Sequence, residues 1–107
     1  MKRMDFNAEI NLLTESCMLA AAALQAEDAG QKERTIARLQ QYESAIETVA
    51  IPAHMTLKRL VLQTIRSAIR FLEKGKQSDE KLTRRNGEKV SKELGRLKRL
   101  AQRRGAV

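Results

Sequence analysis

Three observations predict an all-α fold with three to four helices. Apolar residues recur at helical spacing along most of the 107-residue chain. β-branched and aromatic residues never alternate with polar ones over a useful length, as they would in strands. One proline and five glycines divide the chain into four segments, and the total length is that of a single domain. We therefore expect a helical hairpin with a buried central helix (residues 1–76) and a basic C-terminal helix of the same domain (residues 77–107).

The first segment, from about residue 5 to residue 28, carries an unbroken apolar seam. Its members, at alternating spacings of four and three residues, are Phe6, Ile10, Leu13, Cys17, Ala20 and Leu24. Asp5 is expected to cap the start of this helix, and Gly30 to follow its end. Because the seam is longer than one hairpin partner requires, we expect a homodimer or a higher assembly. The predicted interface residues are Phe6, Ile10, Leu13, Cys17 and Leu24.

The second segment, about residues 31–49, has a narrower apolar stripe. Its members are Ile36, Leu39, Tyr42, Ile46 and Val49. The short break at Gly30 makes an antiparallel hairpin with the first helix the simplest topology. Pro52 then pushes Ile51 out of the helical region and ends the segment.

The third segment, about residues 53–74, has apolar residues over an arc of roughly 200°. So wide a face must contact neighbours on two sides, which predicts the central helix of the fold. Three arginines share its remaining polar face: Arg59, Arg66 and Arg70.

The fourth segment, about residues 79–104, follows a turn at residues 75–78, with Ser78 as the expected N-cap. Its apolar seam consists of Val90, Leu94, Leu97 and Ala101. Gly87 and Gly95 each cost about 1 kcal/mol relative to alanine inside a helix. Because this helix would be marginal alone, we expect it to pack on a partner surface.

Charge is distributed unevenly along the chain, whose formal net charge is +8. Residues 1–56 hold five cations and eight anions, whereas residues 57–107 hold sixteen cations and five anions. Residues 81–104 alone contain ten cations against two glutamates. Such asymmetry is typical of proteins that bind nucleic acids.

The cations of the fourth segment recur at alternating spacings of four and three residues, which gathers them on one helix face. This basic stripe consists of Arg85, Lys89, Lys92, Arg96, Arg99 and Arg103. It lies about 150° around the helix from the apolar seam and contains no acid. Six cations along roughly 27 Å can reach several phosphates of a duplex, which carries one negative charge per about 1.7 Å.

The sequence therefore predicts a small, non-enzymatic regulatory or accessory protein that binds DNA or RNA through phosphates, with weak sequence preference. The arginines of the third segment would form a second patch. An alternative from another class is a helical adaptor or inhibitor, which would bind an acidic protein through the stripe or a partner helix through the first seam. A third interpretation is a merely solvated charged face.

Several function classes are excluded by composition. One histidine and one cysteine cannot build a Cys/His zinc site or a disulfide within one chain. Aromatic residues make up only 3% of the chain, which disfavours modules that stack bases on aromatic platforms. His54 has no Ser, Cys or carboxylate at a spacing typical of catalytic pairs, and Cys17 lies on an apolar helix face. We expect no enzyme activity, no metal and no cofactor.

Membrane association is not expected either. No apolar run reaches the roughly 18 residues of a membrane span. The basic helix has no Trp or Phe on its apolar side, as a helix lying on a membrane surface would. A cytoplasmic location follows as the default expectation.

Overall fold

The computed structural model describes residues 5–105, and their side chains up to residue 100. These residues form four α-helices and no strand, so the predicted all-α class is confirmed. The helices are α1 (Phe6–Ala23), α2 (Ala29–Ile46), α3 (Met55–Lys74) and α4 (Gln77–Gly105), with a single 3₁₀ turn, η1 (Pro52–His54), before α3.

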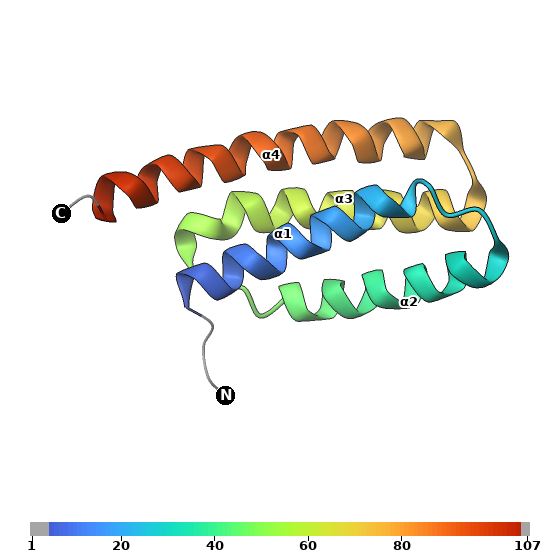
Figure 1. Cartoon of the computed structure of the whole chain (residues 1–107), viewed down its shortest axis with the longest axis horizontal. Helices are drawn as coiled ribbons and strands as arrows, with labels where there is room; N and C mark the ends of the chain where they lie inside the picture. The colour runs from blue at the N-terminus through green and yellow to red at the C-terminus, as the bar shows by residue number, and fades with distance from the viewer. Residues whose placement is uncertain (1–4, 106–107) are drawn as a thin grey trace.

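The helices are arranged in two unequal layers (Figure 1). α2, α3 and α4 lie side by side with α3 in the middle, and α1 lies across α3 as the second layer. α1 also contacts α2 and, over a shorter stretch, α4. Successive helices run antiparallel, and the molecule is flat, with extents of 50 × 31 × 17 Å. One side of the three-helix layer is therefore only partly covered.

Two aspartates fix where the first two helices begin. The Asp5 carboxylate accepts a hydrogen bond from the Ala8 N–H at 2.7 Å, which confirms the predicted cap of α1. The Asp28 carboxylate likewise accepts from the Gln31 N–H at 2.7 Å, so α2 already begins at Ala29. The prediction that Gly30 follows the end of the first helix was therefore wrong, because Gly30 belongs to the first turn of the second.

The connection between α3 and α4 is shorter than the sequence suggested. Gly75 takes the left-handed conformation, with φ of 68°, and its N–H donates to the Phe71 carbonyl at 2.7 Å. The chain reverses there, and the carbonyl of Lys76 accepts from Asp79 and Glu80. α4 thus begins at Gln77, and the prediction of Ser78 as its N-cap was wrong.

α3 supplies the centre of the hydrophobic core. Leu57, Val61, Ile65 and Ala68 have no exposed surface, and α1, α2 and α4 all pack on this helix. From the neighbouring helices, the fully or almost fully buried residues include Leu13, Ala20, Leu39, Ile46, Val90 and Leu97. Among residues 5–105, no helix is both long enough and apolar enough to span a membrane.

The apolar seam of α1 packs largely against other parts of the same chain. Leu13 is completely buried, so it has no surface to offer a second copy. Phe6 packs edge-on against His54, with ring centroids 4.3 Å apart, and Ile10 and Cys17 are half-buried against the core. Leu24 is half-buried at the end of the helix. A homodimer stays a prediction, but Leu13 belongs to the core of the single chain.

Candidate nucleic-acid interface

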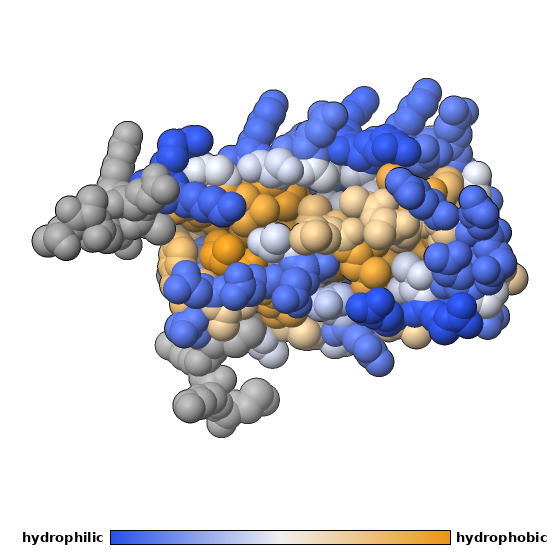
Figure 2. Space-filling model, in the orientation of Figure 1, coloured by the Kyte–Doolittle hydropathy of each residue, from blue (hydrophilic) through white to orange (hydrophobic). Residues whose placement is uncertain are grey.

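The cations of α4 lie outside the part of the helix that is buried against α3. Val90 and Leu97, on the side toward α3, are each 1% exposed. The stripe residues Arg85, Lys89, Lys92, Arg96 and Arg99 are all exposed. Figure 2 shows hydrophilic side chains standing along this edge of the molecule. The predicted stripe residue Arg103 lies in the helix, but its side chain is outside the described residues.

The arginines of α3 adjoin this stripe. One surface hollow is lined by Gln63, Arg66 and Arg70 of α3 together with Leu82, Asn86 and Lys89 of α4. A second hollow is lined by Leu60, Lys89, Lys92, Glu93, Arg96 and Arg99. Lys89 lines both, and Arg66 lines a third hollow together with Arg59. The two groups of cations thus form one surface, which we call the basic face: Arg59, Arg66, Arg70, Arg85, Lys89, Lys92, Arg96 and Arg99.

Carboxylates neutralise part of the basic face. Arg66 pairs with Glu43 at 2.9 Å, and Arg70 pairs with Asp79 at 3.3 Å. Arg96 forms a bidentate pair with Glu93 through its Nε at 2.8 Å and its Nη2 at 2.6 Å. These hydrogen bonds from Arg96, together with its charge, outweigh the effect of burial and lower the pKa of Glu93.

The interpretation of the stripe as free of acids therefore needs correction. Glu93 lies beside the stripe, and its side chain reaches Arg96 from three residues earlier in the chain. Five cations of the basic face have no ion pair among the described side chains: Arg59, Arg85, Lys89, Lys92 and Arg99. Those five are the ones free to meet an anionic ligand at no cost in broken pairs.

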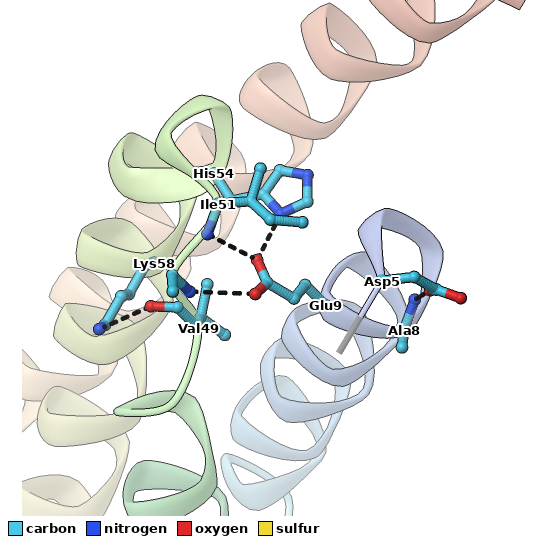
Figure 3. Close-up of polar contacts among 8 residues, drawn as sticks. Asp5, Ala8, Glu9, Val49, Ile51, His54 and Lys58 are labelled. Atoms are coloured by element: carbon cyan, nitrogen blue, oxygen red, sulfur yellow. Dashed lines mark hydrogen bonds and ion pairs between the residues drawn. The ribbon is translucent and has the colours of Figure 1, made fainter. Parts of the chain in front are cut away.

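A second polar cluster joins α1 to the connection between α2 and α3, and it is buried (Figure 3). His54 Nδ1 lies 2.8 Å from Oε1 of Glu9, and the two side chains are 0% and 2% exposed. Glu9 also accepts hydrogen bonds from the backbone N–H groups of Ala50 at 3.0 Å and Ile51 at 3.3 Å. The cluster ties the first turns of α1 to the connection between α2 and α3.

The environment of Glu9 keeps it ionised. Burial by itself raises the pKa of this carboxyl group, but the hydrogen bonds from Ala50, His54 and Ile51 outweigh burial and lower it. Because an ionised carboxylate only accepts, Nδ1 of His54 must carry the proton that it donates. Nε2 of His54 is buried without a hydrogen-bond partner among the described residues.

No spacing in the sequence indicated a carboxylate partner for His54, but the fold places Glu9 beside it. Glu9 lies 45 residues earlier in the sequence, so no local spacing could reveal the pair. A carboxylate that orients a histidine also occurs in catalytic sites, but both side chains here are closed to solvent. Their contacts with α1 and the α2–α3 connection make them part of the framework of the fold. Cys17 is also half-buried, and burial raises the pKa of its thiol, which disfavours the reactive thiolate.

Other chemistry finds little support in the described part of the chain. No group of three or more His, Cys, Asp and Glu side chains capable of holding a metal ion occurs among these residues. Comparisons with protein-family models, curated proteins and solved structures found no match.

Proposed function

We propose that this protein is a small, non-enzymatic nucleic-acid-binding factor of the cytoplasm, which contacts phosphates through the basic face of α3 and α4. The observation that carries the proposal is the continuity of that face, where Lys89 joins the stripe of α4 to the arginines of α3. Five of its cations have no carboxylate partner among the described side chains. Unpaired, exposed cations on one surface are what a polyanion requires.

The dimensions favour a duplex over a single strand. Arg85 and Arg99 are separated by 14 residues, or roughly 21 Å along the helix, a length over which duplex DNA carries about a dozen phosphates. Neither hollow along the stripe is lined by an aromatic side chain on which a base could stack. Contacts to phosphates position a protein without reading sequence, so we expect weak sequence preference.

The decisive experiment is a salt titration of binding to a short fluorescent duplex, followed by anisotropy. Each phosphate that a cation contacts makes the slope of log K against log salt more negative by about 0.9, because counterions are released from the duplex. Contacts from the four unpaired cations of the stripe therefore predict a slope of about −4. The variant Lys89→Ala/Lys92→Ala/Arg99→Ala should lose about three of these units and weaken binding evenly across sequences.

The matched control is Lys32→Ala/Arg34→Ala/Arg38→Ala in α2, which removes the same formal charge from a different helix. It should leave the slope nearly unchanged, because only cations in contact with phosphates release counterions. Equal losses in both triple variants would show that net charge, not the basic face, governs binding. A DNA duplex and an RNA duplex of the same base sequence are titrated separately, because the amino-acid sequence does not indicate which of them the protein binds.

A helical adaptor for an acidic protein is the competing function. Polyglutamate serves as its probe in the same assay, because it offers carboxylates without the geometry of phosphates. Binding to polyglutamate with no binding to either duplex at low salt would replace the nucleic-acid proposal with the adaptor.

A further inference from the structure

The partly covered layer leaves room for another helix. Among the described residues α1 is the single helix lying on the layer of α2, α3 and α4 (Figure 1), and hydrophobic residues are exposed on this face of the molecule (Figure 2). Beside α1, toward α4, the surface is hollowed. The hollow is a groove of about 620 Å³. From α1 it is lined by Thr14, Cys17, Met18, Ala21, Leu24 and Gln25; from α3 and α4 by Thr64, Thr83, Arg84, Gly87, Glu88, Val90, Ser91 and Leu94.

The surface of this groove is mostly apolar, and its lining carries no net formal charge. Its only charged lining residues are Arg84 and Glu88, and Arg84 already pairs with Glu80 at 3.0 Å. The Met18 side chain at its rim is 67% exposed, more than any other large hydrophobic side chain described. On the opposite wall, a Cβ atom added at Gly87 would meet nothing within 4 Å. A protruding apolar side chain and open space at a glycine thus line the same groove.

We infer that the groove is occupied by α1 of a second copy of this chain, with the two α1 helices side by side and parallel about a twofold axis that runs along them. In an isologous dimer a contact from one copy to the other is made twice, so a face that carries both a projection and a recess complements itself. Met18 of each copy would enter the groove of the other near Gly87. Each α1 would then lie on its own α2 and α3 and on the partner's α3 and α4.

Charge limits where two copies can meet. Each chain carries a net charge of +8, so association through the basic face would bring like charges together. The groove face is neutral, and the stripe of α4 points away from it. In the twofold arrangement the two stripes lie at opposite edges of the dimer, where their mutual repulsion is smallest.

The predicted interface of α1 is revised by this arrangement. Cys17 and Leu24 of the seam line the groove, whereas Met18 and Ala21 replace the buried Leu13 as contacts between copies.

Sedimentation equilibrium of the nuclease-treated full chain tests the dimer directly. We expect a dimer at micromolar concentration, and Met18→Glu should weaken its dissociation constant at least 100-fold or so, because the symmetry buries two unpaired carboxylates. The matched control is Met55→Glu, at a methionine that is also exposed but lies in the first turn of α3, away from the groove. This control should remain dimeric.

Gly87→Gln tests the opposite wall without removing any contact of the single chain. Its side chain projects into the groove and favours the helix, so the monomer should keep its circular dichroism and gain thermal stability while dimerisation weakens. A monomeric wild-type chain, or a folded Met18→Glu variant that dimerises like the wild type, would overturn the proposal. Because nucleic acid is absent throughout, these outcomes do not depend on whether the basic face binds it.

Discussion

Two hydrogen-bonded pairs of this molecule each contain a glutamate, but their surroundings differ. Glu9 and His54 meet at 2.8 Å in the interior, whereas Glu93 and Arg96 meet at 2.6 Å on α4, where the Arg96 side chain is 49% exposed and that of Glu93 is 10% exposed. The first pair joins residues 45 positions apart, and the second joins residues within one helical turn. Similar distances therefore give no measure of what each pair contributes.

The two pairs differ in whether another group can replace the carboxylate. Water or a phosphate can take the place of Glu93 at the Arg96 guanidinium, because that group is already solvated. Nothing can take the place of Glu9 without leaving the buried His54 and two backbone N–H groups unsatisfied. The buried pair is thus part of the framework, and the exposed pair belongs to a surface available for binding.

The largest expected effect follows from removing the buried carboxylate. Glu9→Ala should lower the free energy of unfolding by about 3–5 kcal/mol, because His54 and the N–H groups of Ala50 and Ile51 lose their common acceptor. Urea unfolding followed by circular dichroism measures this. A loss below about 1 kcal/mol would show that water reaches the cluster and that the contrast between the two pairs is false.

The same cluster predicts how stability depends on pH. Because the pKa of Glu9 is lower in the folded than in the unfolded chain, its contribution is complete above its ordinary pKa of 4.5 and is lost as pH falls through the folded value. Urea midpoints measured from neutral pH downward should therefore decline in acid. The pKa of Glu93 is also lowered, so this residue adds to the loss of stability in acid. In the Glu9→Gln variant the urea midpoint should therefore depend on pH less steeply than in the wild type, but the dependence should not vanish.

Removing a buried hydrogen bond between uncharged groups should lower stability less than removing Glu9 and more than removing the charge of Glu93. The hydroxyl groups of Ser67 in α3 and Thr83 in α4 are 2.8 Å apart and buried, and Thr83 also donates to the Asp79 carbonyl. Ser67→Ala removes the contacts of this hydroxyl with Thr83 and with the Thr64 carbonyl, but Thr83 can still donate to the Asp79 carbonyl, so we expect a loss of about 1 kcal/mol. If urea unfolding shows a loss as large as that of Glu9→Ala, charge is not what distinguishes the buried pair.

The smallest effect on stability is expected at the exposed pair. Glu93→Gln should lower the urea midpoint only slightly at neutral pH, because the Arg96 partner is half exposed, and it releases Arg96 to the basic face. Anisotropy titrations should then show tighter duplex binding, with a salt slope steeper by up to about one unit. A destabilised variant with unchanged binding would place Glu93 in the framework instead.

The sequence predicted most of the helices because their apolar periodicity and caps are local. The four segments, the Asp5 cap and the buried face of α3 all follow from residues within a few turns of one another. The cap at Asp28 was missed because Gly30, two residues later, gives a competing signal for a helix end. The basic stripe was predictable as a helix face, although the reach of the Glu93 side chain was not.

Contacts between residues that are far apart in the sequence could not be predicted from local patterns. Glu9 on α1 and His54 before α3 meet only because α1 crosses the layer at that point. Likewise, Arg66 and Lys89 line one hollow because α3 and α4 pack side by side. The groove depends on where α1 lies across the layer, and no periodicity in α1 or α4 encodes that position.

The two-residue link of Gly75 and Lys76 has a consequence for how the chain folds. Closing so short a loop costs little entropy, and α3 and α4 share the most extensive packing of any two helices. We therefore expect this C-terminal hairpin to form in the transition state, with Ser67→Ala slowing folding, while Glu9→Ala mainly speeds unfolding. Stopped-flow chevrons of the two variants measure both rates. During synthesis α1 leaves the ribosome first, yet it would have to wait for α3 before its carboxylate finds His54.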